Sequence, residues 1–233
     1  MSTTPFDVGT PLHDAAGPQR PLLRAGTTAL DLAARPALLA VPTAAAAGAA
    51  VPLLVFFHGS RGDPQQSLAL VGAAAERRGV AVLAPASSDY SWDLVVGAPG
   101  PDVAVVRRGL AEVAALLPVD PARLCLGGFS DGASYALTVG LANPAAVEAV
   151  TAFSPGFAVD GAGAARPRCF VAHGTADRVL PIERTSRVLV PRLRRAGHEV
   201  QDVEFTGGHE VPAAVLERAL GWWLGGPPAR ARG

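Results

Sequence analysis

The stretch Gly-Phe-Ser-Asp-Gly at residues 128–132 decides the fold class of this 233-residue sequence. The apolar run from Arg123 to Phe129 leads into it and is predicted to be a strand, and the segment from Ala133 to Leu141 is predicted to be a helix. A serine between glycines at a sharp strand-to-helix turn is the pattern of a nucleophile elbow, which exposes the hydroxyl at the carboxyl end of a sheet. The pattern therefore indicates that Ser130 is a nucleophile carried by a sheet that helices cover.

Short apolar runs alternate with longer segments rich in Ala and Leu through most of the chain. Residues 51–57 form the first clear strand, and they are apolar almost without interruption, as in a strand covered on both faces. Such alternation predicts an α/β fold with one mostly parallel sheet and helices on both faces. The predicted strands are 51–57, 80–85, 123–129, 149–153, 168–173 and 199–205, and the predicted helices are 67–78, 102–117, 133–141, 184–196 and 212–224.

The bulk composition is that of a single folded domain. Hydrophobic residues make up 49% and charged residues 17% of the chain, far from the range in which chains stay disordered. We expect residues 1–50 to contribute one or two strands and an Ala-rich connection to the same domain as the catalytic core at 51–224. Residues 225–233, which combine prolines with a basic Ala-Arg end, are expected to be a disordered tail.

Charge and targeting signals argue against several classes of partner. The formal net charge of +0 gives no broad basic field for nucleic acid or for an anionic membrane. The N-terminus lacks the basic start and apolar core of a secretory signal. We therefore expect a cytoplasmic protein without a membrane span, present as a monomer or a homodimer.

A serine hydroxyl needs a general base, usually a histidine that a carboxylate orients. Asp177 ends the strand-and-turn segment that begins at Cys169, and His209 follows the predicted strand that ends near Phe205. Both fall at the same edge of the sheet as Ser130, in the chain order Ser, Asp, His that a hydrolase with a nucleophile elbow requires. We predict a catalytic triad of Ser130, Asp177 and His209.

The other histidines receive structural interpretations. His13 lies in an irregular segment and His198 in a turn before a strand, so both are expected at the surface. His173 precedes a glycine at a strand end and should brace the loop that holds Asp177. His58 lies closer to the chemistry, because it opens the turn after the first clear strand.

That turn, Phe-His-Gly-Ser-Arg-Gly-Asp at residues 57–63, is the candidate oxyanion loop. In hydrolases with a nucleophile elbow, a His-Gly turn at this place supplies one donor, and the residue after the nucleophile supplies the other. We assign these donors to the backbone N–H groups of Ser60 and Asp131. The carboxylate of Asp131 should be turned away, because its negative charge would oppose an oxyanion.

The two cysteines and the cofactor requirement are simple to interpret. Cys125 and Cys169 each sit in a short apolar run that is predicted to be a strand, so both are expected to be buried thiols. Neither a disulfide nor a metal site is indicated. The triad chemistry needs no metal and no organic cofactor, so we expect none, and the implied partner is a small-molecule ester.

Several segments between about Val51 and Trp223 resemble, in order, those of the phospholipase/carboxylesterase family of small α/β-hydrolase serine esterases. The resemblance implies the α/β-hydrolase fold without a large lid domain, and the short connection from Phe153 to Cys169 leaves no room for one. It also implies hydrolysis of carboxylic esters through an acyl-enzyme. The matching segments are Phe-Phe-His-Gly-Ser-Arg-Gly-Asp, Trp-Asp, Gly-Pro-Asp, Gly-Gly-Phe-Ser-Asp-Gly-Ala-Ser, Ala-Phe-Ser-Pro-Gly-Phe, His-Gly-Thr-Ala-Asp-Arg-Val-Leu-Pro and Gly-Gly-His-Glu-Val-Pro.

Four side chains in loops after strand ends are candidates for lining an acyl or alcohol pocket. They are Trp92, Phe157, Val179 and Leu180. The alternative for each is a role in the core or in anchoring a loop. For Trp92, next to Asp93 in a chain with few aromatic residues, the choice is between capping the pocket and fixing its loop by a hydrogen bond.

The substrate class stays open between alternatives. Acyl-protein thioesterases that resemble this chain commonly carry Gln after the nucleophile, so Asp131 favours a small or short-acyl ester. A lysophospholipase or acyl-thioesterase that acts on long chains is the alternative, and it would need a long apolar groove. A dienelactone-type hydrolase would need Cys in place of Ser130. An idle relative that binds a ligand or partner without catalysis is the alternative from a different class.

Overall fold

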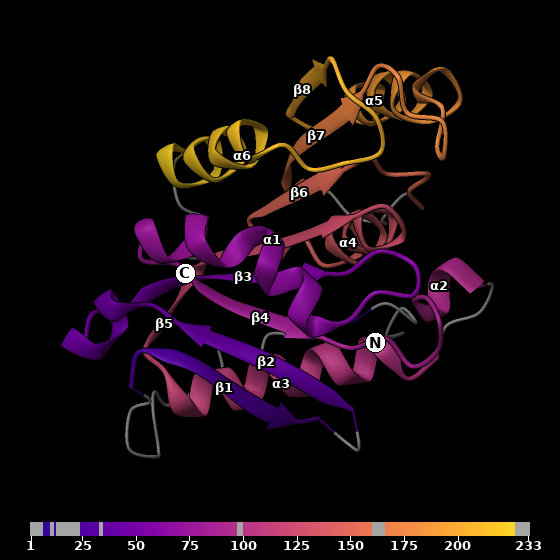
Figure 1. Ribbon diagram of the computed structural model, residues 1–233. Coiled ribbons are helices and arrows are strands. Elements are labelled where there is room, and N and C mark those ends of the chain that lie inside the picture. Colours follow the sequence, from indigo (N-terminus) through magenta and orange to yellow (C-terminus); the bar gives the residue numbers. More distant parts are fainter. Residues whose placement is uncertain are drawn as a thin grey trace.

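The computed structural model describes residues 7–9, 12, 24–32, 35–96, 100–159 and 166–226. Eight strands form one sheet in the order β1-β2-β4-β3-β5-β6-β7-β8, and helices lie on both of its faces (Figure 1). The strands are β1 (Gly26–Asp31), β2 (Pro36–Val41), β3 (Val51–Phe57), β4 (Ala81–Pro85), β5 (Val119–Phe129), β6 (Ala149–Phe153), β7 (Arg168–Gly174) and β8 (Val200–Phe205). The helices are α1 (Pro64–Arg77), α2 (Asp93–Val96), α3 (Asp102–Leu116), α4 (Asp131–Ala142), α5 (Ser186–Arg195) and α6 (Ala213–Gly225), with 3₁₀ turns η1 (Thr43–Ala47) and η2 (Ile182–Arg184).

The sheet is mostly parallel, so the predicted α/β-hydrolase arrangement is confirmed. The pairs from β4 through β3, β5, β6 and β7 to β8 are parallel, whereas β1, β2 and β4 pair antiparallel. All residues of β4 and β6 are buried, as strands covered on both faces require. Because the central strands run in one direction, the loops after β3, β5, β6, β7 and β8 meet at one edge of the sheet.

Each face of the sheet has its own hydrophobic core. Leu53 and Val55 of β3 point into the core that α3, α4 and α5 cover, and Leu54 and Phe56 point into the core under α1 and α6. Successive residues of a strand face opposite sides, so a nearly continuous apolar run serves both cores. Figure 1 shows α1 and α6 together on one side of the sheet.

Helix α6 is tied to the sheet by a buried ionic group. Glu148, just before β6, accepts hydrogen bonds from Arg168 Nη2 at 2.7 Å and from Trp223 Nε1 at 2.9 Å. Trp223 is fully buried within the second core. The contact holds the helix that follows the His209 loop, and it lies at the amino edge of β6, away from Ser130.

Most predicted elements are confirmed, and the differences have local causes. Helix α1 begins at Pro64 because Asp63 caps it by accepting the Gln66 N–H at 2.7 Å, and because proline fits the first helical position. The helix predicted for 184–196 is divided into η2 and α5 at Thr185, whose backbone angles of −121° and −98° are not helical. The short helix α2 was not predicted.

The N-terminal part contributes two strands, as predicted. β1 and β2 continue the sheet beyond β4, so they share its hydrogen bonding with the core strands. Helix α6 extends to Gly225. Of the tail predicted to be disordered at 225–233, Gly225 instead ends α6, and residues 227–233 lie outside the described residues, as does His13, which was predicted to lie at the surface.

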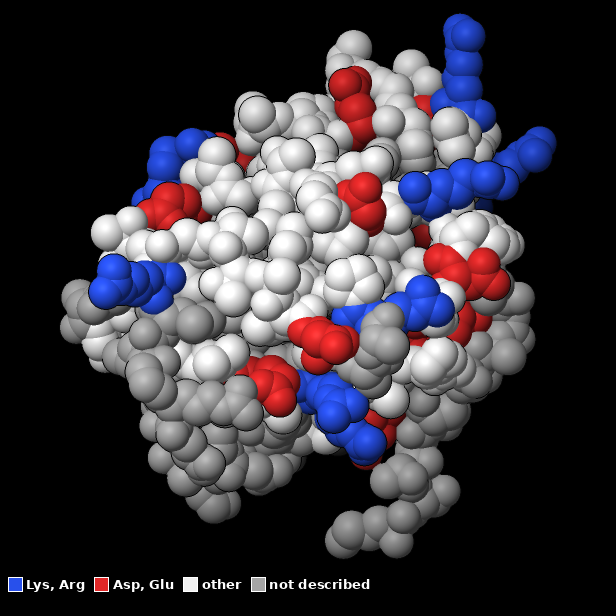
Figure 2. All heavy atoms as spheres, turned by 60° about the horizontal axis from the view of Figure 1, so that its bottom comes forward, with Lys and Arg blue, Asp and Glu red and all other residues white. Residues whose placement is uncertain are grey.

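Two observations describe the surface. No helix within the described residues is long and apolar enough to cross a membrane. On the face seen in Figure 2, basic and acidic side chains are interspersed among uncharged ones.

Cys125 and Cys169 are free and buried, as predicted, and burial raises the pKa of both thiols, that of Cys169 to about 12.

Candidate active site

Ser130 stands at a strained turn between β5 and α4. Its φ of 58° and ψ of −120° are unusual for a residue with a side chain, and its N–H donates to Phe153 O at 2.9 Å. A Cβ on Gly132 would collide with the carbonyl oxygens of Phe57 and His58, and a Cβ on Gly128 would collide with the Gly132 carbonyl. Gly132 is therefore required by the close approach of the elbow to the end of β3, and Gly128 by the tightness of the elbow itself.

The three predicted triad residues come together in one hydrogen-bonded chain. His209 Nε2 lies 2.9 Å from Ser130 Oγ, and His209 Nδ1 lies 2.7 Å from Asp177 Oδ2. Ser130 is 8% exposed and Asp177 is 5% exposed. Both contacts have the length that a nucleophile, a base and an orienting carboxylate need.

The carboxylate of Asp177 is held at both oxygens. Oδ1 accepts the backbone N–H groups of Val179 at 2.9 Å and of Leu180 at 2.8 Å, and Oδ2 accepts from His209. Burial alone would raise the pKa of Asp177, but the hydrogen bonds from His209 and from the loop outweigh it, so the pKa lies below its usual value. An ionised carboxylate holds the proton on His209 Nδ1 and leaves Nε2 free to accept from Ser130.

The loops that carry Asp177 and His209 pack backbone against backbone. Thr175 N–H donates to Phe205 O at 2.8 Å, and Ala176 N–H donates to Gly207 O at 2.9 Å. A Cβ on Gly174 would lie 2.6 Å from Gly207 O and would collide with the carbonyl oxygen of Gly208. Gly174 thus allows the contact that sets the distance between the carboxylate and the imidazole.

Phe129, between the strand and the nucleophile, covers the imidazole from one side. Its ring centroid lies 4.6 Å from that of His209, with the rings tilted by 39°. The sequence reasoning treated Phe129 only as the end of a strand. Its place directly before Ser130, at the sheet edge where His209 was expected, was a signal that it would lie near the imidazole.

The predicted oxyanion loop lies against the elbow. A Cβ built on Gly59 would be 3.4 Å from Ser130 Cβ, so the turn passes beside the nucleophile. Among the described residues, neither the Ser60 N–H nor the Asp131 N–H donates a hydrogen bond. Both groups therefore remain available to a ligand atom.

His58 fixes the start of this loop from inside. Its Nδ1 lies 2.8 Å from Gly59 O, and its Nε2 accepts the Ser87 N–H at 3.2 Å. Burial lowers the pKa of His58, in keeping with a neutral ring that donates from Nδ1 and accepts at Nε2. Trp92 Nε1 donates to His58 O at 2.9 Å.

Trp92 does not line an open pocket. Its ring is fully buried and stacks on Tyr135 at a centroid distance of 4.9 Å. Together with its bond to His58, this supports the loop-anchoring alternative, and the pocket-lining expectation for Trp92 is corrected. A stiff indole ring under the loop restricts its position, which explains why an aromatic residue stands there.

The other predicted positions divide by exposure. The Asp131 carboxylate, which was expected to turn away from the oxyanion, accepts from Ser91 Oγ through its Oδ2 at 2.6 Å. Phe157 is 37% and Val179 is 66% exposed, and Leu180 is half-buried beside Gly156. None of these three lines either of the two cavities described below.

The remaining histidines have the expected structural settings. His173 Nε2 lies 3.2 Å from Asp177 Oδ2, consistent with the predicted bracing of that loop. His198 is half-buried and contacts Pro167 O at 3.3 Å through Nδ1. Among the described residues, no three His, Cys, Asp or Glu side chains are grouped as metal ligands.

A cavity of about 410 Å³ opens beside the nucleophile. The oxyanion loop forms one wall, α1 forms another, and Phe129 closes the side toward His209. The lining residues are His58, Gly59, Ser60, Gln66, Ser67, Ala69, Leu70 and Phe129. Most of this lining is apolar, with Gln66 and Ser60 as its exposed polar members.

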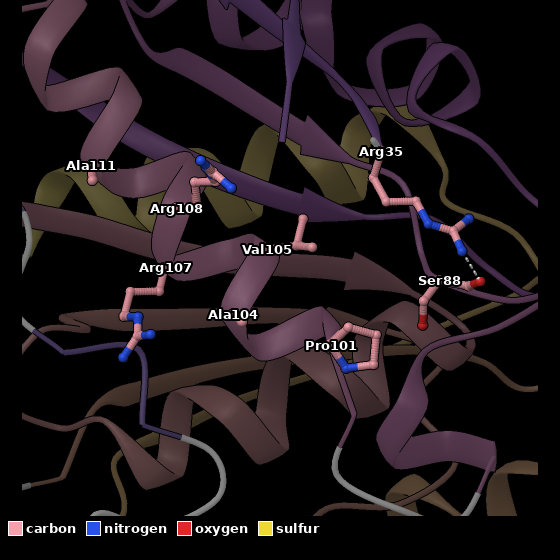
Figure 3. Close-up of a pocket in the computed structure, with 8 residues that line it drawn as sticks. All are labelled: Arg35, Ser88, Pro101, Ala104, Val105, Arg107, Arg108 and Ala111. Carbon is pink, nitrogen blue, oxygen red and sulfur yellow. Dashed lines mark hydrogen bonds between the residues drawn. The ribbon is translucent and has the colours of Figure 1, made fainter. Parts of the chain in front are cut away.

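A second cavity, of about 480 Å³, lies apart from the triad along α3 (Figure 3). Arg35 reaches across to the carbonyl oxygen of Ser88 at its edge. None of the three triad residues lines it. Its lining lies on α3 and around Arg35 and Ser88, whereas the lining of the first cavity includes Gly59 and Phe129, which adjoin Ser130.

The Gly174 contact leads to a prediction. Gly174→Ala should separate the Asp177 and His209 loops and lower kcat for ester hydrolysis roughly 10- to 100-fold, because a displacement near 1 Å in an oriented site can cost about 100-fold. Gly208→Ala is the matched control, since a Cβ there meets no atom within 4 Å. The check is steady-state kinetics of the two variants and the parent. Equal kcat in both variants would contradict this role of Gly174.

Comparison with solved structures finds the same fold in several esterases. Esterase PE8 is 23% identical, with a TM-score of 0.64 over 87% of this chain and 99% of its own. The Bacillus cereus carboxylesterase is 20% identical, with a TM-score of 0.64 over 83% of this chain and 95% of its own. Thermogutta terrifontis esterase 2, phosphorylated by paraoxon, is 18% identical, with a TM-score of 0.68 over 86% of this chain and 94% of its own. At such identities the likeness concerns the fold.

Family membership comes from the sequence itself. No curated protein matches the chain significantly. The model of the phospholipase/carboxylesterase family matches residues 105–221, half of the chain, and this span contains Ser130, Asp177 and His209. The chain therefore belongs to the phospholipase/carboxylesterase family and is a carboxylic ester hydrolase.

Proposed function

We propose that Ser130, His209 and Asp177 form the catalytic triad of this esterase and that it cleaves small or short-acyl esters. The observation that carries the triad is the unbroken chain of hydrogen bonds from Ser130 Oγ through the imidazole to the Asp177 carboxylate. The sequence order and the loops after β5, β7 and β8 that carry these residues agree with it.

The chemical steps draw on groups already in position. Ser130 Oγ attacks the ester carbonyl carbon while His209 Nε2 takes its proton, and the N–H groups of Ser60 and Asp131 stabilise the oxyanion. The tetrahedral intermediate expels the alcohol, which receives the proton from His209, and the acyl group stays on Ser130. His209 then activates a water molecule that releases the acid.

The idle-relative alternative predicts a different geometry. A binding protein without catalysis has no need for a base within hydrogen-bond reach of the nucleophile. Here the base lies 2.9 Å from Ser130 Oγ. The orienting carboxylate accepts three hydrogen bonds and lies 3.2 Å from His173 Nε2. Such organisation supports an active enzyme.

The cavity beside Ser130 supports the preference for short acyl groups. Its volume of about 410 Å³ is near the lower end of the range of about 300–1,000 Å³ typical of ligand pockets. The acyl group stays on the enzyme after the alcohol has left, so the mostly apolar hollow beside Ser130 suits the acyl group. The open side near Phe157 and Val179 suits the departing alcohol.

Hydrolysis of p-nitrophenyl esters from acetate to palmitate tests the proposal. We expect the highest kcat/KM for short chains and loss of turnover in Ser130→Ala, because the nucleophile is then absent. Circular dichroism of the variant controls for folding. Full activity in Ser130→Ala would contradict the triad, whereas an optimum at long chains would favour the lysophospholipase or thioesterase alternative and leave the triad standing.

A substitution at Leu70 tests the acyl pocket separately. Leu70 lines the cavity and is 39% exposed, so Leu70→Ala should lengthen the pocket without disturbing the core. We expect kcat/KM for octanoate relative to acetate to rise several-fold. Each methylene of the acyl chain that enters a hydrophobic pocket contributes at most about 1–3 kcal/mol of discrimination between substrates. Val188→Ala on α5, also exposed, is the control and should leave the chain-length profile unchanged. An unchanged profile in Leu70→Ala would place the acyl group elsewhere.

A further inference from the structure

A second histidine contacts the carboxylate of the proposed triad. His173, in β7, is 1% exposed. Its Nε2 lies 2.8 Å from Leu180 O and 3.2 Å from Asp177 Oδ2, and its Nδ1 lies 2.6 Å from Ser186 Oγ. Asp177 Oδ2, the oxygen that accepts from His209, therefore has imidazoles on two sides.

These contacts determine which nitrogen of His173 carries the proton. The two oxygens near Nε2 belong to a carbonyl and a carboxylate, and both can only accept. An unprotonated Nε2 would turn its lone pair toward them, so Nε2 must be the donor. Ser186 can rotate its hydroxyl and donate to Nδ1, which completes a neutral ring with every polar atom satisfied.

The charged neighbours are compatible with a neutral ring. Asp177 and His209 lie on one side, and Glu204 lies across the β7–β8 pair, where Arg187 binds its carboxylate at 2.7 and 2.9 Å. Burial lowers the pKa of His173, and this effect is larger than the opposing effects of the Leu180 carbonyl and the Asp177 carboxylate. The ring therefore donates as a neutral imidazole near neutral pH.

We infer that His173 is a positioning residue for Asp177: its Nε2–H donates to Leu180 O, and the same nitrogen lies 3.2 Å from Asp177 Oδ2, the oxygen that accepts from His209. This inference rests on the proposed triad. The Nε2–H thereby fixes the carbonyl of Leu180, the residue whose N–H holds Asp177 Oδ1. Ser186, at the start of α5, accommodates this tautomer by donating to Nδ1, so α5 takes part in orienting the base from outside the contact between His209 and Ser130.

Two substitutions of His173 distinguish the loss of its hydrogen-bond donor from the loss of its side-chain volume. Gln can place an amide N–H about where Nε2 lies, so His173→Gln keeps the donor to Asp177. Asn is shorter and places its amide near Nδ1, so His173→Asn keeps the contact with Ser186 and loses the donor. His198→Asn is the matched control, because that histidine lies in the turn before β8, away from Asp177.

We expect His173→Asn to lower kcat roughly 10- to 100-fold with KM little changed, as for a misaligned reacting group. His173→Gln should recover most of kcat, and His198→Asn should match the parent. Thermal unfolding of each variant shows whether it is folded. Equal kcat in the Asn and Gln variants, whether both high or both low, would overturn the inference.

The parent enzyme offers a measurement that does not depend on a variant or on activity. Two-bond ¹H–¹⁵N correlation spectra of the histidine rings should show His173 as the neutral Nε2–H tautomer at pH 7. An Nδ1–H or doubly protonated ring would overturn the inference. Because the tautomer is read without substrate, this result is separate from the ester assay, whose failure would instead count against the triad.

Discussion

The hydrogen bond from His209 Nδ1 to Asp177 Oδ2, 2.7 Å long, is the interaction on which the arrangement of this edge depends. It can form only if the loops after β7 and β8 approach closely, and the approach is made by backbone groups around Gly174 and Gly207. It also needs an ionised carboxylate, which two backbone N–H groups of the same loop favour. Once the imidazole is oriented in this way, its other nitrogen faces Ser130.

The elbow imposes a second constraint of the same kind. Ser130 reaches the imidazole because the chain turns with a positive φ, and that turn brings Gly132 against the carbonyl groups of the β3 loop. The loop is in turn fixed by the buried side chains of His58 and Trp92. His58 Nε2 accepts the Ser87 N–H, and Trp92 Nε1 donates to the backbone carbonyl of His58. Strain at the nucleophile is therefore balanced by a rigid surrounding, as is usual where a site is organised before its substrate binds.

The sequence predicted the parallel sheet, nearly all its elements and the three residues of the hydrogen-bonded chain Ser130–His209–Asp177, because these depend on apolar periodicity and on short motifs at strand ends. It did not predict that Trp92 is buried, since an aromatic residue after a strand suits a pocket wall and a loop anchor equally. It also left the packing of Phe129 on His209 and the start of β5 at Val119 unpredicted. Those features depend on contacts between segments far apart in the chain, which local patterns do not record. The pairing of His173 with Ser186 is of the same kind, although the His-Gly pair at a strand end did indicate its loop.

The most direct measurement of the central claim is labelling of the purified protein with a fluorophosphonate, followed by mass-spectrometric identification of the modified residue. A serine with a hydrogen-bonded base and an oxyanion loop reacts with such a reagent, whereas an ordinary serine hydroxyl is a poor nucleophile at neutral pH. We expect one phosphonyl group per chain, on Ser130, formed much more slowly in His209→Ala. Folded protein that stays unlabelled, or a label on another serine, would contradict the claim that Ser130, His209 and Asp177 act together.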